Sequence, residues 1–151
     1  MSEPRVDVNF GDQITPAPTA AADIEVAVRE ALDQEGVDRA AISITLLSDA
    51  EIAQLNHQYL QHEGPTDVLS FPLYEKGEPP VGDIYIGYEQ AKRQSSDLAV
   101  PLDTELARLA IHGTLHVLGY VHPDDGAREQ SEMWQRQEEI LRAFLRRAAP
   151  R

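Results

Sequence analysis

The sequence contains no cysteine. Disulfide bonds and thiolate-ligated metal sites are therefore excluded, and any metal ion must be bound through imidazole or oxygen ligands. Long apolar runs are also missing, since no segment approaches the roughly 18 consecutive apolar residues that a membrane-spanning helix requires. Residues 1–10 have neither the basic start nor the cleavage site of an export signal. We therefore expect a soluble, cytoplasmic protein with no membrane partner.

Basic residues are scarce, because 13 Lys and Arg stand against 26 Asp and Glu and give a formal net charge of −13. This balance argues against broad electrostatic attraction to nucleic acid, since phosphate contacts need Lys and Arg. Six of the arginines lie in residues 127–151, against four acids. An RNA partner would have to meet a local basic face, unless these arginines only solvate the last helix and complement its dipole.

The hydropathy pattern predicts one domain over residues 1–151, with a single core built from its 42% hydrophobic residues. Alternating or β-branched runs predict four strands, at 6–10, 41–47, 68–73 and 83–88. Apolar stripes predict five helices, at 23–36, 48–59, 89–98, 103–119 and 127–147. We expect an α+β fold in which a small mixed four-stranded sheet is packed with about five helices.

Helix ends and faces can also be predicted. Asp23 and Asp103 are expected to cap their helices, and Ser48 with Glu51 three residues later has the form of a capping box. The apolar stripe of the last helix, which includes Met133 and the residues up to 145, is expected to be structural.

Three of the five histidines, His112, His116 and His122, lie within eleven residues. Residues four apart share one face of a helix, so the first two can direct ring nitrogens at one ion. Gly119 is expected to end this helix and to let the chain return His122 as a third ligand. Three imidazoles with one open position are typical of catalytic zinc, which makes hydroxide available at neutral pH. The spacing therefore predicts one metal ion per chain at the end of a central helix, which we expect to be zinc, although imidazole also suits nickel, copper or iron.

The same spacing, His-x-x-x-His-x-x-Gly-x-x-His, is that of the metzincin proteases, which carry Glu directly after the first histidine as general base. This chain has Gly113 at that position. A glycine cannot accept a proton, so peptidase chemistry would need a base from elsewhere. A zinc hydrolase that acts on peptide or amide bonds is therefore the alternative interpretation.

Further motifs accompany the histidines in a fixed order. They are Leu55-Asn56-x-x-Tyr59, Pro65-Thr66-Asp67-Val68-Leu69-Ser70-Phe71-Pro72, Gly82-Asp83-Ile84 and His112-Gly113-x-Leu115-His116-x-Leu118-Gly119-Tyr120-x-His122. In these motifs the sequence resembles the YbeY family of bacterial rRNA maturation endoribonucleases, which are single-domain zinc proteins. The motifs span residues 55–122, whereas residues 1–40 contribute little to the resemblance.

The resemblance implies a metal-dependent hydrolase, a zinc-dependent single-strand endoribonuclease that acts in 16S rRNA 3′ end maturation, rRNA processing and ribosome quality control. Its implied partners are ribosomal RNA and small ribosomal subunit proteins, and no DNA partner is expected. His112, His116 and His122 match the family's metal ligands one for one and would act catalytically through the water that zinc activates.

By the same resemblance, three residues are substrate-side candidates. Thr66 and Asp67 would form hydrogen bonds at the rim of the metal cleft, although both can equally cap a turn. Asp83 would either orient a ligand or close a turn.

One departure from the family pattern bears on activity. Members usually have Arg directly after the residue that matches Tyr59, and this chain has Leu60. A guanidinium there would hold a phosphate and stabilise transition-state charge. Arg93 is a substrate-side candidate to replace it, as are Lys92 and Arg108. If nothing replaces it, the chain could be a non-catalytic ribosome assembly factor.

Overall fold

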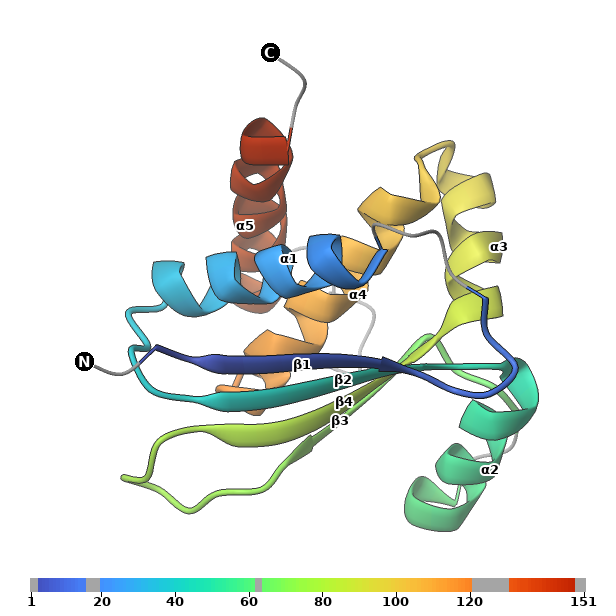
Figure 1. Ribbon diagram of the computed structural model, residues 1–151, viewed down its shortest axis with the longest axis horizontal. Helices are drawn as coiled ribbons and strands as arrows, with labels where there is room; N and C mark the ends of the chain where they lie inside the picture. The colour runs from blue at the N-terminus through green and yellow to red at the C-terminus, as the bar shows by residue number, and fades with distance from the viewer. Residues whose placement is uncertain (1–2, 16–19, 62–63, 121–130, 149–151) are drawn as a thin grey trace.

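The structure is a computed structural model that describes residues 3–15, 20–61, 64–120 and 131–148. Within these residues the chain forms four strands and five helices (Figure 1). In chain order they are β1 (Arg5–Phe10), α1 (Ala20–Gln34), β2 (Ala41–Leu47), α2 (Asp49–Leu60), β3 (Val68–Pro72), β4 (Val81–Gly87), α3 (Tyr88–Leu98), α4 (Leu102–Val117) and α5 (Glu132–Ala148). The predicted α+β class is confirmed.

The four strands form one mixed sheet in the order β1-β2-β4-β3. The β1–β2 and β2–β4 pairs are parallel and are joined through helices, whereas β3 and β4 form an antiparallel hairpin. In the hairpin Ser70 lies opposite Ile84, and Phe71 lies opposite Asp83. Because successive side chains point to opposite faces of a sheet, these two pairs belong to different faces. The predicted four-stranded mixed sheet is therefore confirmed, with β3 at one edge.

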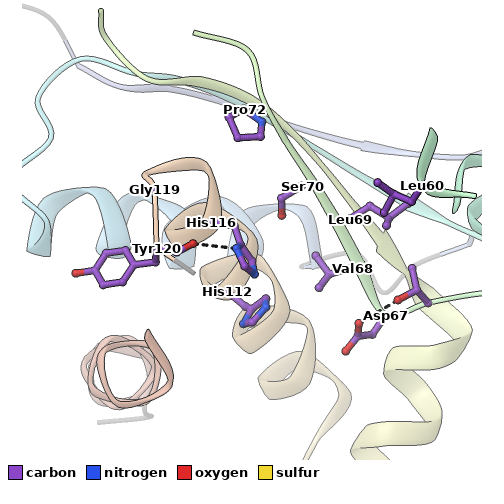
Figure 2. Close-up of a pocket in the computed structure, with 11 residues that line it drawn as sticks. Leu60, Asp67, Val68, Leu69, Ser70, Pro72, His112, His116, Gly119 and Tyr120 are labelled. Carbon is purple, nitrogen blue, oxygen red and sulfur yellow. Dashed lines mark hydrogen bonds between the residues drawn. The ribbon is translucent and has the colours of Figure 1, made fainter. Parts of the chain in front are cut away.

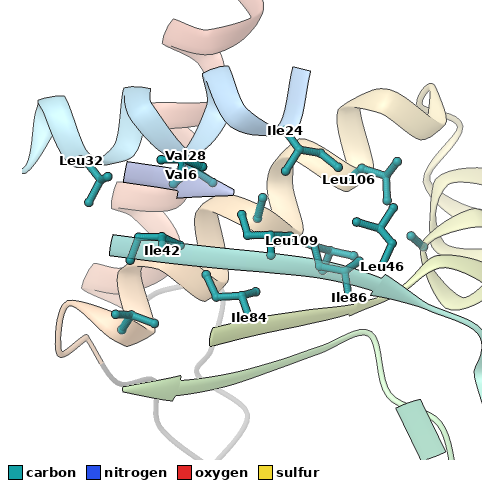
Figure 3. Packing of buried hydrophobic residues seen from close by; sticks show 14 residues of the cluster. Val6, Ile24, Val28, Leu32, Ile42, Leu46, Ile84, Ile86, Leu106 and Leu109 are labelled. Carbon is teal, nitrogen blue, oxygen red and sulfur yellow. The ribbon is translucent and has the colours of Figure 1, made fainter. Parts of the chain in front are cut away.

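Helices cover the two faces of the sheet unequally (Figure 1). α1 and α4 lie on one face, and the isoleucines of β2 and β4 pack beneath them in the main core (Figure 3). α4 is central, since it packs against α1, α3, α5, β3 and β4. α2 lies on the opposite face, where Ile52 and Leu69 form a smaller cluster with Leu47. His112 and His116 therefore lie on a helix that packs against both the sheet and several other helices.

The helix ends agree only in part with the sequence prediction. Ser48 accepts a hydrogen bond from the backbone N–H of Glu51 at 3.2 Å and its own N–H donates to that carboxylate at 3.0 Å, so the capping box is confirmed. Asp23 and Asp103 lie inside first turns, and the N-cap of α4 is Pro101, so these two caps were wrong. Both aspartates still face the positive end of a helix dipole.

The predicted beginning of the last helix, at 127–130, falls outside the residues that the structure describes. None of the helices in the described ranges combines the length and the apolar character that crossing a bilayer requires.

Candidate active site

His112 and His116 lie side by side in the last two turns of α4. Their ring centroids are 4.7 Å apart and the ring planes make an angle of 78°. Both rings line a cleft of about 600 Å³ between α4 and β3 (Figure 2). His112 is buried, with 5% of its surface exposed. The i, i+4 spacing thus brings the two imidazoles together at the wall of a cleft.

Hydrogen bonds fix the tautomer of each imidazole. Nδ1 of His112 donates to Oε1 of Gln137 at 2.6 Å. Nδ1 of His116 donates to the backbone oxygen of Tyr120 at 3.0 Å (Figure 2). The amide of Gln137 is itself oriented, because its Nε2 donates to Glu138 at 3.0 Å. Carbonyl oxygens accept and do not donate, so the proton of each neutral ring is on Nδ1 and the lone pair is on Nε2.

This arrangement fits a divalent metal ion by donor type. Metal-binding histidines generally donate their second ring N–H to a carbonyl or carboxylate, which orients the ring and makes the other nitrogen a better ligand. Neutral imidazole is a preferred ligand of zinc, at about 2.0–2.1 Å. Within the described residues no group of three potential metal ligands forms. The third predicted ligand, His122, lies outside the described residues, so the three-histidine set stays a prediction.

α5 supports His112 through a buried polar network that sequence reasoning missed. Gln137 is only 1% exposed, and its neighbour Glu138 accepts a hydrogen bond from Nε of Arg108 at 3.0 Å. Arg108 also forms a salt bridge with Glu105 on α4. Burial raises the pKa of Glu105, against the opposing effect of Arg108. The network ties α5 to α4 directly below the histidine.

His116 is supported by Glu35, which directly follows α1, and by Arg136 of α5. The hydroxyl of Tyr120 donates to Oε1 of Glu35 at 2.8 Å, and Arg136 forms a salt bridge with the same carboxylate. Burial and the hydrogen bond to Glu35 raise the pKa of the Tyr120 phenol. The hydrogen bond to Glu35 thus holds the side chain of Tyr120 in place. The backbone oxygen of the same residue accepts the hydrogen bond that orients the ring of His116. Neighbouring residues of α5, Arg136 and Gln137, thus support one histidine each.

A signal for Gln137 is present in the sequence. The buried stripe of α5 runs through Met133, Ile140, Leu141 and Phe144, and Gln137 occupies the same stripe as its one polar member. A buried amide within an apolar stripe needs hydrogen-bond partners. The prediction that this stripe is structural overlooked that requirement.

Close packing of α4 against the sheet requires a glycine at position 113. A Cβ there would lie 2.7 Å from Cγ2 of Ile84 on β4 and 3.1 Å from Oγ of Ser70 on β3. The position faces the sheet, so a glutamate at 113 would force α4 away from β4. Gly119 has a φ of +109° just beyond α4, and the predicted end of the helix at this residue agrees with that turn.

Two of the substrate-side candidates lie in the cleft. Thr66 and Asp67 line it at the entry to β3. The carboxylate of Asp67 accepts a hydrogen bond from Nε2 of Gln94 at 3.1 Å, and its backbone oxygen accepts from Gly87 at 2.8 Å. Asp83 does not lie with them, because it lines a separate pocket formed by α2 and the β3–β4 hairpin.

The candidate cations do not reach the cleft. Arg93 is exposed on α3, and its guanidinium donates to both carboxylate oxygens of Asp49, at 3.0 and 2.9 Å. Arg108 lies on α4 and is held by salt bridges to Glu105 of α4 and Glu138 of α5. Among the described residues no Lys or Arg lines the cleft, whereas Leu60 does. Arg93 is thus directed toward α2 and away from the cleft, and its substrate-side role stays a prediction.

The fold and site together define an α+β protein in which two imidazoles lie side by side at the wall of a cleft, each held through its Nδ1. The family model described as Endoribonuclease YbeY matches residues 9–145. The chain belongs to the endoribonuclease YbeY family. The family predicted from the sequence motifs is confirmed, and with it the class of enzyme, an endoribonuclease.

Two relatives match over most of the chain. Endoribonuclease YbeY of Persephonella marina is 40% identical over 124 residues, which cover 78% of this chain and 79% of that protein. The Bacillus subtilis protein of the same name is 38% identical over 134 residues, 81% of this chain and 84% of that one. The solution structure of TM1509 from Thermotoga maritima has a TM-score of 0.68 at 24% identity and covers 95% of this chain and 91% of that chain, which supports the fold alone.

Proposed function

We propose that this chain is a zinc-dependent endoribonuclease that cleaves single-stranded ribosomal RNA, with one zinc ion held by His112, His116 and His122. The observation that carries the proposal is the pair of Nδ1 hydrogen bonds, which put the lone pair of both described imidazoles on Nε2. Zinc in such a site acts as a Lewis acid toward a phosphoryl oxygen and lowers the pKa of a coordinated water.

The cleft suits an extended RNA strand. Its volume of about 600 Å³ is in the range of pockets that take one nucleotide-sized ligand. One wall is the edge strand β3, which an extended chain can follow. The hydroxyl of Thr66, which donates to Oδ1 of Asp67 at 3.5 Å, can accept a hydrogen bond from the RNA, and Asp67, oriented by Gln94, can accept from a ribose hydroxyl. Since no cation lines the described part of the cleft, we expect phosphate binding to depend strongly on the metal ion.

Membership of the family supports a role in 16S rRNA 3′ end maturation, rRNA processing and ribosome quality control. In that role the partners are ribosomal RNA and small ribosomal subunit proteins, and the location is the cytoplasm. The net charge of −13 fits such a role, since an acidic chain is a poor nonspecific binder of RNA and needs a specific site.

The test is cleavage of a single-stranded fragment from the 3′ end of 16S rRNA by the zinc-loaded protein. Native protein and His57→Ala, which changes an exposed histidine of α2, are expected to cleave equally. His116→Ala is expected to reduce cleavage to background. Equal residual cleavage by native protein and His116→Ala would indicate a contaminating nuclease and would overturn the proposal.

A peptide or amide hydrolase is the second candidate, and one observation favours it. In the described part of the chain β3 pairs only with β4, so its other edge, beside the histidines, can pair with an extended peptide. The packing of Gly113 against Ile84 counts against it, because that position has no room for a general base. Cleavage of a peptide library by preparations that leave the RNA intact would favour the hydrolase. Binding to the small subunit without any cleavage would favour a non-catalytic assembly factor.

A further inference from the structure

A second pocket lies on the face of the sheet opposite α4. It has a volume of about 260 Å³ and is lined by Leu55, Tyr59, Phe71, Leu73, Asp83 and Tyr85. We call it the aromatic pocket. Phe71 contacts Tyr59 at a centroid distance of 5.8 Å and 67°, and Tyr85 at 5.9 Å and 70°. Neither contact is face to face, so a flat ligand can still stack on an aromatic face. Tyr59 is 59% exposed and therefore accessible.

The aromatic pocket combines apolar walls with one carboxylate. Asp83 lies directly opposite Phe71 in the β3–β4 hairpin, and no Lys or Arg lines this pocket among the described residues. Burial and the charge of Asp83 raise the pKa of the Tyr85 phenol. A phenol is neutral at neutral pH in any case, so this hydroxyl can donate a hydrogen bond. A carboxylate without a cation beside it repels phosphate and attracts hydrogen-bond donors.

The aromatic pocket is the neighbour of the histidine cleft across a single strand. Ser70 and Pro72 of β3 line the cleft, whereas Phe71 between them lines the aromatic pocket. At the end of α2, Tyr59 lines the aromatic pocket and Leu60 lines the cleft. A single strand of RNA that crosses the edge of β3 therefore meets both sites.

We propose that the aromatic pocket binds a guanine base of the RNA strand whose backbone occupies the histidine cleft. This inference rests on the proposed function. Guanine presents two adjacent donors, N1–H and the N2 amino group, and one carboxylate can accept from both. Its flat ring stacks on aromatic side chains, as bases of single-stranded RNA do in other proteins. The volume is below the roughly 300–1,000 Å³ of drug-sized pockets, which suits one base and not a whole nucleotide.

The binding test uses mononucleotides, so that it is independent of cleavage. Guanosine monophosphate is titrated into the full chain while the aromatic resonances are followed by NMR, with adenosine and inosine monophosphate for comparison. We expect guanosine monophosphate to shift the signals of Tyr59, Phe71 and Tyr85 and to bind about tenfold more tightly than adenosine monophosphate. Inosine monophosphate, which lacks the amino group, should be intermediate.

Two variants sharpen this test. Asp83→Asn should abolish the preference for guanine, whereas the control Asp97→Asn, an equal charge change on exposed α3, should keep it. Tyr59→Leu retains apolar volume without a ring and should weaken all the nucleotides severalfold. If the guanine and adenine nucleotides bind equally, or shift signals elsewhere, the inference is overturned. It is also overturned if N-acetylarginine amide shifts the same rings more strongly, since the pocket would then take a cationic side chain of a protein.

Failure of this inference is distinguishable from failure of the proposed function. Guanine binding without RNA cleavage would overturn the endoribonuclease and leave a base-binding pocket. Cleavage that depends on His116, without any preference for guanine, would overturn the pocket alone.

Discussion

Gln137 of α5 accepts a hydrogen bond at 2.6 Å from Nδ1 of His112 on α4, 25 positions away in the sequence. Both residues are buried, so the bond is shielded from water. It fixes the ring so that Nε2 carries the lone pair, and the metal affinity of the site should depend on it.

Replacement of Gln137 by Leu should therefore weaken zinc binding roughly ten- to hundredfold. Gln137→Glu retains an acceptor at the same place and should keep most of the affinity. Gln54→Leu, an equivalent change on the exposed face of α2, is the control. Zinc titration against a competing chelator measures the difference, and equal affinities for all four proteins would contradict the role of Gln137.

Gly113→Ala should destabilise the fold although alanine is the better helix former by about 1 kcal/mol. The added methyl would lie 2.7 Å from Cγ2 of Ile84, and overpacking of this kind costs about 1–3 kcal/mol. In an Ile84→Ala background the same change should cost much less, because the clashing atom is gone. Urea unfolding of the four proteins gives the coupling, and additive effects would show that the contact does not limit packing.

Glu105 should give the stability a measurable pH dependence. Burial raises its pKa above 4.5, the value of an unburied glutamate, so the folded chain holds this proton to a higher pH than the unfolded chain. The contribution of Glu105 to stability is thus lost as the pH rises from about 4.5 through the raised value.

Glu105→Gln cannot ionise and should lack this loss. The free energy of unfolding of the variant, relative to native protein, should therefore increase across that pH window. Urea unfolding at a series of pH values measures the difference. If the difference in the free energy of unfolding stays constant with pH, or if native protein gains stability relative to Glu105→Gln as the pH rises, the raised pKa of Glu105 is refuted.

Leu60→Arg should increase RNA cleavage, by on the order of tenfold, because it places a cation where the described cleft has none. Leu60 is 46% exposed, so the guanidinium would remain hydrated and the fold should tolerate it. Leu60→Gln adds polarity without charge and serves as the control. If the arginine and glutamine variants cleave equally, the charge at this position is irrelevant to turnover.

The sequence predicted the elements of this fold better than their ends. Apolar residues recur with helical spacing in α4 and α5 and alternate with polar residues in the strands. Both patterns follow from which side chains are buried, so the hydropathy of the sequence reveals them. The capping box of Ser48 and Glu51 is a local interaction and was predicted correctly. The caps at Asp23 and Asp103 were wrong, because either helix can gain residues upstream when tertiary packing favours them.

At the site, the spacing predicted that His112 and His116 share a face, since helical geometry alone brings them together. Helical spacing could not predict the residues that accept hydrogen bonds from the two imidazoles. Gln137 and the Tyr120 backbone oxygen are brought in by the packing of α5 and by the turn after α4, which are long-range features. Charge pairing of Arg93 with Asp49 likewise depends on how α3 packs near α2.

The most direct test of the metal centre is the zinc content of the purified protein, measured by elemental analysis for native protein, His112→Ala and His57→Ala. We expect a single zinc ion per chain in the native protein and in His57→Ala, and its loss from His112→Ala. Native protein without a stoichiometric metal ion after zinc loading, or full zinc retention by His112→Ala, would contradict it.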